Sequence, residues 1–521
     1  MSPTSRRISF LAVAVCVLGL LVWAYLFHAR HEWALADYKK QMRGAGERLS
    51  VDELLPRPLV LESNGARIIL EAQRHLPAKP ALLDTNPPQA MQMVALGKAL
   101  VGWKQLDMRD EGTNTWEQVE TELERESEVL DPLEQLIETP SLDFHLDYHQ
   151  GYNLLLPHLA KLKQLAQRLK SAALYDLHKG DPARAITRTR SILALGNGLA
   201  YERLVISQLV RLSITHIAVS ANWELLQSST VTEQQLAELQ KEWMALDFIE
   251  GAANALLMER AVGEQTADEL RESSANYRSI MGTRGGSGGD WLGNLGQAAA
   301  EKGKETMWRY AWSYPDQLKG LQGKQTLLAG LRSLKDGEPY KSVLESQKRE
   351  LAKLGIEQRS KDDDGLLFSG EDPRYMFTDS VLALERFPHR LMSAEIARQL
   401  LVTAIGLKRY QLKHGSNPPS LAALVPEFLP PLPHGRGSVM KSGTALPCDP
   451  VDGEPLRYKL NSDGTFLLWS IGEDGVDNGG DPVTPPNTKS FPWLKGRDVV
   501  WPVPATDAEV SARHEKIHGG R

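Results

Sequence analysis

Apolar side chains recur at steps of three and four over much of residues 31–265, and this spacing predicts helices. The stretch around and after Pro157 carries the clearest stripe: Leu155, Leu159, Leu162, Ala166, Leu169 and Ala173. Gly180, Asp181 and Pro182 then supply a helix stop, an N-cap and a first-turn proline. A second helix follows over residues 183–199. We therefore predict a helical domain over residues 31–265 that contains a helical hairpin.

A different pattern opens the chain. From Ile8 to Phe27, twenty residues carry no charge, and a helix of that length spans about 30 Å, the hydrocarbon thickness of a bilayer. Arg6 and Arg7 precede the run, which favours an N-terminus on the cytoplasmic side. We predict an N-terminal transmembrane helix that contacts the lipid bilayer through Ile8 to Phe27. A cleaved signal peptide is the alternative.

The last part of the chain combines one long helix with strands. Apolar positions from Leu391 onward predict a helix to His414, which Gly415 ends. Two alternating runs, residues 456–460 and 466–470, flank an Asp-Gly turn and predict a β-hairpin. We expect a small α+β domain here.

These patterns give one fold prediction. The chain is expected to be mainly α with a C-terminal α+β domain: an N-terminal transmembrane helix, a helical-hairpin domain, then a long helix with a small antiparallel sheet. The predicted units are an anchor at 1–30, a helical domain at 31–265, a glycine-rich linker and helical connector at 266–390, the α+β domain at 391–504 and a polar tail at 505–521.

Composition narrows the class of function. The 521 residues include 60 basic and 66 acidic side chains, which gives a net charge of −6. A nucleic-acid binder needs a basic face, so no nucleic-acid partner is expected. The hydrophobic share of 42% and the charged share of 24% are those of an ordinary globular chain.

Candidate chemistry in the helical part is limited. His145 and His149 stand four residues apart, a spacing that ligates metals on helices, but no HExxH motif surrounds them. A structural His pair is the alternative. An envelope hydrolase would require Asp143, His145 and His149 to converge in a polar pocket. Cys16 and Cys448 form no CxxC or zinc pattern.

An acidic, glycine-rich loop follows the predicted hairpin. Calcium takes six to eight oxygen ligands, and Asp474, Asp477, Asn478 and Asp481 could supply several of them from this one loop. The same residues also dominate ordinary turns, in which their carboxylates accept local amide hydrogens. Both interpretations stay open at the level of sequence.

The C-terminal unit resembles the globular domain of the major pseudopilins of type II secretion systems. The resemblance rests on an ordered series of motifs: Leu424-Val425-Pro426, Leu432-Pro433, Asp449-Pro450, Gly453-x-Pro455-x-x-Tyr458, Ser470-x-Gly472-x-Asp474-Gly475 and Gly479-Gly480. It implies a calcium ion in the loop, with Asp474 and Asp498 at positions that correspond to family ligands. The predicted metal set is therefore Asp474, Asp477, Asp481 and Asp498.

The whole chain also resembles large, uncharacterised membrane-anchored bacterial proteins that end in such a module. We expect a single-pass protein of the bacterial inner membrane, mostly extracytoplasmic, that acts as a scaffold or interaction protein with unidentified envelope protein partners. No catalytic residue is predicted. The alternatives are an envelope hydrolase with its site in the helical domain, or a divergent type II secretion component.

Overall fold

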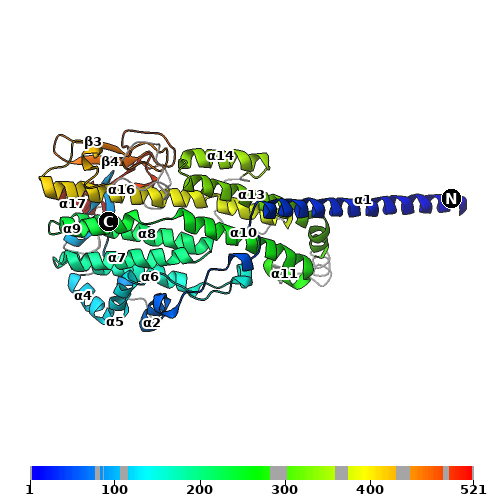
Figure 1. Cartoon of the computed structure of the whole chain (residues 1–521), viewed down its shortest axis with the longest axis horizontal. Coiled ribbons are helices and arrows are strands. Elements are labelled where there is room, and N and C mark those ends of the chain that lie inside the picture. Colours follow the sequence, from blue (N-terminus) through cyan, green and yellow to red (C-terminus); the bar gives the residue numbers. More distant parts are fainter. Residues whose placement is uncertain are drawn as a thin grey trace.

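Helices dominate the computed structural model of the chain, and one of them projects far beyond the body (Figure 1). The structure describes residues 3–76, 82–85, 87–105, 115–281, 302–357, 373–429, 446–484 and 492–518. The α-helices are α1 (Pro3–Gly44), α2 (Ala66–His75), α3 (Leu82–Thr85), α4 (Trp116–Arg125), α5 (Ser127–Leu130), α6 (Pro157–His178), α7 (Pro182–Gly198), α8 (Val205–Leu226), α9 (Glu233–Met244), α10 (Ile249–Glu272), α11 (Ser274–Met281), α13 (Ser313–Lys335), α14 (Tyr340–Lys353), α15 (Met376–Glu385), α16 (Phe387–His414) and α17 (Asp507–His518). The strands are β1 (Gln92–Ala95), β2 (Lys98–Leu100), β3 (Arg457–Leu460), β4 (Phe466–Ser470), β5 (Val499–Val500) and β6 (Val503–Pro504).

The helical hairpin consists of α6 and α7, and local chemistry sets its turn. Gly180 adopts a positive φ of 80°, a conformation that costs glycine little. The Asp181 carboxylate then accepts the amide hydrogen of Arg184 at 3.0 Å, so it caps the N-terminus of α7. The two helices leave this turn side by side and bury their apolar stripes against α8.

One hydrophobic core runs through most of the body. It extends in sequence from Ile68 near the start to Trp501 near the end, and α8 and α16 contribute many of its side chains. Trp223 and Trp243 are fully buried within it. The residues of the predicted helical domain and those of the C-terminal unit therefore share a single core, and each supplies part of the apolar surface that the other covers.

The two sheets lie in different parts of the sequence. In the C-terminal unit, β3, β4 and β5 form an antiparallel sheet in which Trp469 pairs with Arg457 on one side and with Val500 on the other. The second sheet has the order β1-β2-β6. Its β2–β6 pair is parallel and joins Lys98 to Val503, so the end of the chain returns to the helical part.

Further contacts fix the C-terminal unit to the helices. The amide of Tyr340, at the start of α14, donates to the carbonyl of Pro450 at 3.0 Å, and the next amide donates to Val451. The predicted polar tail forms α17, in which Arg513 donates to the carbonyl of Met93 at 2.7 Å. The first two bonds join segments about 110 residues apart in sequence, and the last joins segments 420 residues apart.

The second half of α1 packs on the body, whereas its first half projects (Figure 1). Leu35 and Met42 are buried against Leu321 of α13. At the end of the helix, Glu47 accepts hydrogen bonds from Arg332 at 2.6 and 3.0 Å and from Arg260 at 2.9 Å. Apolar packing and a buried ion-pair network therefore hold this half of α1 in place.

The predicted N-terminal transmembrane helix is the part of the fold prediction that the structure corrects. Among the described residues, no helix is both long enough and apolar enough to cross a membrane. The apolar run from Ile8 to Phe27 does not stand as a separate element. It is the first part of a 42-residue helix, α1, whose later residues include charged side chains such as Lys39 and Arg43 and pack against α13.

The predicted glycine-rich linker falls largely outside the described residues. Its first residues, 266–272, complete α10, Ser274–Met281 form α11, and residues 282–301 are not described. The connector that follows is helical, as α13, α14 and α15. The predicted domain boundaries stay predictions.

Candidate functional site

Asp498 organises the acidic loop of the C-terminal unit. Its carboxylate is fully buried and accepts the backbone amide hydrogens of Gly480 at 2.7 Å, Asp481 at 3.1 Å and Asn478 at 3.1 and 3.2 Å. Burial raises the pKa of Asp498, against the effect of these amide donors. The loop therefore folds around this side chain as an amide nest folds around an anion.

The other three predicted metal ligands also accept local amide hydrogens. Asp474 accepts from Val476 at 2.9 Å, and Asp481 accepts from Val483 at 3.0 Å. Asp477 accepts from the amide of Gly479 and from the indole Nε1 of Trp469, both at 3.0 Å. These are Asx-type turns, in which a carboxylate stabilises the backbone two residues further on.

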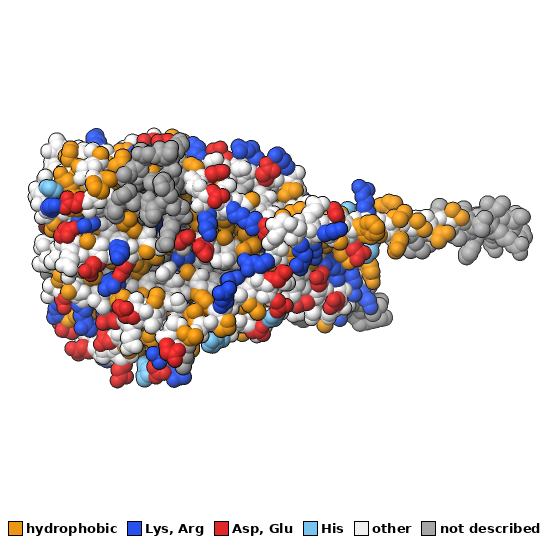
Figure 2. All heavy atoms as spheres, in the orientation of Figure 1, with side chains coloured by type: hydrophobic (Ala, Val, Ile, Leu, Met, Phe, Trp, Pro, Cys, Tyr) orange, Lys and Arg blue, Asp and Glu red, His pale blue; other side chains and the backbone are white. Residues whose placement is uncertain are grey.

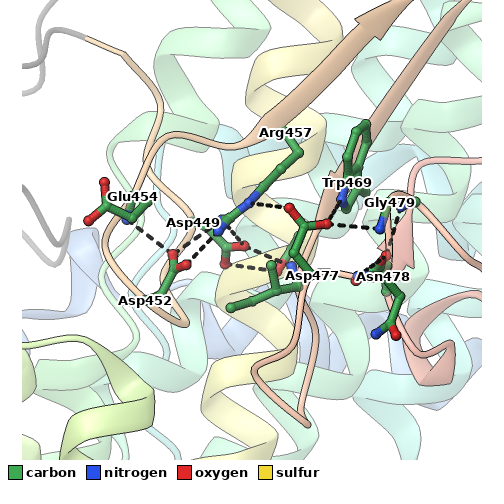
Figure 3. Close-up of polar contacts among 12 residues, drawn as sticks. Asp449, Asp452, Glu454, Arg457, Trp469, Asp477, Asn478 and Gly479 are labelled. Atoms are coloured by element: carbon green, nitrogen blue, oxygen red, sulfur yellow. Dashed lines mark hydrogen bonds and ion pairs between the residues drawn. The ribbon is translucent and has the colours of Figure 1, made fainter.

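Arg457 of β3 lies between three carboxylates beside this loop (Figure 3). Its guanidinium nitrogens lie 3.0 Å from Asp449, 2.5 Å from Asp452 and 3.5 Å from Asp477. The planar guanidinium presents five donors in a fixed fork, which suits several carboxylates at once. Arg457 thereby connects the turn before β3 to the loop after β4.

Asp449 is the most deeply embedded of these carboxylates. It is fully buried and accepts from the amides of Val451 and Ile471 at 3.0 and 2.9 Å and from the Ser470 hydroxyl at 2.8 Å. Burial raises the pKa of Asp449, and these hydrogen bonds oppose the rise. The indole of Trp469 lowers the pKa of the more exposed Asp477. The cluster is a fully bonded network.

The geometry does not offer calcium a set of convergent oxygen ligands. The Asp498 carboxylate faces three amide hydrogens, and the guanidinium groups of Arg457 and Arg497 lie 3.5 Å from Asp477 and Asp481. These carboxylates are therefore paired with amide and guanidinium donors in this arrangement. Over the described part of the chain, no group of three or more His, Cys, Asp or Glu side chains is placed to hold a metal. Calcium binding stays a prediction of the sequence.

The structure separates the three candidates for a hydrolytic site. Asp143 pairs with His145, with 3.3 Å between Oδ2 and Nδ1, and also accepts the His145 amide hydrogen. The ring of His149 faces Asp52 instead, with 3.3 Å between Nε2 and Oδ1. His149 and Asp52 line an open cleft of about 320 Å³ whose lining also includes Lys39 but neither Asp143 nor His145.

The helical part also contains a buried chain of His, Glu and Ser side chains that no sequence motif predicts. His158 lies 2.8 Å from Glu202, and the Ser207 hydroxyl donates to the other oxygen of the same carboxylate. All three side chains are buried. The glutamate occupies the middle position, where a hydrolase needs the histidine. The arrangement therefore satisfies buried polar groups and does not activate the serine.

The first half of α1 presents an uncovered apolar surface. Six described side chains there are between 51% and 70% exposed: Val15, Leu18, Val22, Trp23, Tyr25 and Leu26. Figure 2 shows apolar side chains along the described part of the projecting helix. The body begins just beyond them, where His28 lies 2.9 Å from the carbonyl of Tyr310. Isolated apolar side chains are common on protein surfaces, but a contiguous apolar helix indicates an interaction site.

Comparisons of the chain with models of protein families, with curated proteins and with solved structures found no match. The functional argument therefore rests on the residues and their geometry. The resemblance of the C-terminal unit to pseudopilins stays a prediction.

Two features of the site were missed in the sequence. Arg457 stands in a predicted strand, and its only sequence signal is the nearby pair of acidic residues Asp449 and Asp452. The role of Asp498 as the hydrogen-bond acceptor at the centre of the loop has no local sequence signal, because the amides that donate to it lie 17 to 20 residues earlier in the chain.

Proposed function

We propose that this protein is a scaffold or interaction protein whose helical body presents the first half of α1 to a protein partner. The observation that carries the proposal is the exposed apolar surface of α1. Six described side chains between positions 15 and 26 are more than half exposed. Burying such a surface is favourable by about 25 cal/mol per Å² of apolar area. A projecting helix of this kind can dock its apolar side against a second protein.

The attachment of α1 to the body supports the same proposal. Lys39 pairs with Glu264 at 2.6 Å, and Glu47 bonds to Arg260 and Arg332. Burial disfavours the ionised form of Glu47, but the hydrogen bonds from its partners outweigh this effect and lower its pKa to about 2. The carboxylate is therefore charged at neutral pH and holds the helix base. A fixed base gives the projecting half a defined direction.

The continuous core is the second support. Because the helical part and the C-terminal unit share one core, the body is expected to act as a single platform and not as a chain of loosely linked modules. A platform of this kind suits a scaffold. Location at the bacterial envelope, and a role in type II secretion, stay predictions of the sequence.

The proposal is tested by photo-cross-linking in cells. Leu18→Cys in a Cys16→Ala background is labelled with a benzophenone maleimide, and the matched control is Trp33→Cys, whose position on α1 is 79% exposed beside the body. We expect a discrete protein adduct from position 18 on irradiation, and much less from position 33. If position 18 gives no protein adduct, or only lipid adducts, the proposed function is wrong.

A further inference from the structure

The open cleft that His149 and Asp52 line lies where the packed half of α1 meets α10 (Figure 1). Its volume of about 320 Å³ is at the lower end of the range of small-molecule sites. Its walls come from α1, from residues 49–52, from the turn that holds His149 and from α10. A ligand in this space would therefore contact four segments that are distant in sequence.

The two helical walls of the cleft carry charges of opposite sign. Lys39 and Arg43 line it from α1 and stand four residues apart, so they lie on one side of that helix. Glu264 and Asp268 line it from α10 with the same spacing. A ligand with one sign of charge is repelled by one of these walls. A ligand with both a positive and a negative group meets the opposite charge on each.

The inner charges are paired across the cleft, whereas the outer charges are not. Lys39 lies 2.6 Å from Glu264, and both side chains are mostly buried. Arg43 and Asp268 are 55% and 58% exposed. Arg43 bonds to Glu53 at 3.0 Å and Asp268 bonds to an arginine of its own helix, and among the described residues no ion pair joins Arg43 to Asp268. Exposed ion pairs of this kind are weak, so a ligand can compete with them.

Apolar side chains complete the lining. Leu49, Val51 and Ala261 line the cleft and are buried in the free chain. An apolar group that packs against them leaves water, which is favourable by about 25 cal/mol per Å² of apolar area. The cleft thus combines a cation, an anion and an apolar surface.

We propose that this cleft binds a free α-amino acid with an apolar side chain. Its carboxylate binds Arg43, its ammonium group binds Asp268, and its side chain packs against Leu49 and Val51. A guanidinium has five N–H donors, and the one described bond to Glu53 leaves enough of them for a two-bond contact with a carboxylate. The site does not depend on the partner of the projecting half of α1, so it stands or falls apart from the proposed function.

Isothermal titration of the full chain with leucine tests the site. We expect saturable binding with a Kd of about 0.1 to 1 mM, which is within reach of a ligand of about nine non-hydrogen atoms. N-acetyl-leucine lacks the ammonium group and leucinamide lacks the carboxylate, and each should bind at least tenfold more weakly. These comparisons use the unaltered chain, so they do not depend on how a variant folds.

Variants then place the ligand in the cleft. Arg43→Gln and Asp268→Asn should each weaken leucine binding at least tenfold while the melting temperature of the free chain stays close to that of the wild type. Arg30→Gln is the matched control, because Arg30 is an exposed arginine of α1 that does not line the cleft. Leucine should bind this variant with the wild-type Kd.

Four results would overturn the assignment. Leucine gives no binding heat, or it binds no better than the two analogues that lack one charge. Arg43→Gln and Asp268→Asn bind leucine as well as the wild type does. Leucylleucine, in which the two charges are further apart, binds more tightly than leucine.

Discussion

The indole Nε1 of Trp223 donates a hydrogen bond of 2.8 Å to the carbonyl of Pro502, a residue 279 positions later in the chain. Trp223 is fully buried in α8, and Pro502 lies between β5 and β6. The bond joins the centre of the helical part to the last strands. It is one of the contacts that make the two predicted units a single body.

Trp223→Phe should destabilise the whole chain. The substitution keeps an aromatic ring but leaves the Pro502 carbonyl buried without this donor, which costs about 1 to 3 kcal/mol. Urea unfolding measures the change, and Trp33→Phe at an exposed position serves as the control. Equal stability of the two variants would show that the bond contributes nothing.

Glu47→Gln should weaken the base of α1 in a pH-dependent way. The pKa of Glu47 is lowered to about 2 in the folded chain, so the ionised form stabilises the fold above its unfolded pKa near 4.5, and this contribution is lost as the pH falls toward 2. The substitution also leaves the buried Arg260 without its ion-pair partner, a loss of about 3 kcal/mol at pH 7. Unfolding at pH 7 and pH 3 should show the difference between wild type and variant shrink by about 2 kcal/mol. A difference that does not change with pH contradicts this account.

Glu224→Gln should have the opposite pH dependence. Glu224 is fully buried and accepts the amide hydrogens of Met91 and Gly102, and burial raises its pKa to about 7. A raised carboxyl pKa means that the folded state holds the proton more tightly, so wild-type stability falls as the pH rises from 4.5 through 7. Between pH 5 and 8 the variant should therefore gain about 2 to 3 kcal/mol relative to wild type. Parallel stability curves for the two proteins would refute the raised pKa.

Asp498→Ala should open the acidic loop. The substitution leaves the amides of Asn478, Gly480 and Asp481 without their acceptor, and we expect their hydrogen exchange to accelerate at least tenfold. Asp474→Ala is the matched control, since that carboxylate accepts only the Val476 amide among the bonds described. Similar exchange in both variants would mean that Asp498 does not organise the loop.

Calcium removal should leave the C-terminal unit unchanged. Amide hydrogens and guanidinium groups face the carboxylates of Asp498, Asp477 and Asp481, so the geometry gives the ion no advantage. A site with a Kd of about 10 µM would stabilise the protein by about 2.7 kcal/mol at 1 mM calcium. We expect the same melting temperature in 1 mM calcium and in EDTA. A clear rise with calcium that Asp474→Ala abolishes would instead establish the ion site predicted from the sequence.

Local chemistry made several elements predictable. The turn of Gly180, Asp181 and Pro182 places the break between α6 and α7, and Gly415, with φ of 78°, ends α16. These signals act over a few residues, so they can be identified in sequence. The β3–β4 hairpin around Gly464 is of the same kind.

The prediction of an N-terminal transmembrane helix was wrong because it, too, used only local signals. Hydropathy identified an apolar run but not the length of the helix that contains it, because nothing at Phe27 stops a helix. The residues after it continue helical to Gly44 and find their partner in Leu321 of α13, a residue about 280 positions away. A local pattern could not supply that contact.

The sequence by itself determined the helical periodicity and the caps and turns, because each depends on neighbours within one or two turns of the chain. Only the tertiary structure decided that the helical part and the C-terminal unit share a core, that Asp498 accepts the amide hydrogens of Asn478, Gly480 and Asp481, and that Asp143 and His149 face different partners. Each of these depends on groups brought together across long stretches of chain, where the packing of side chains selects the partner.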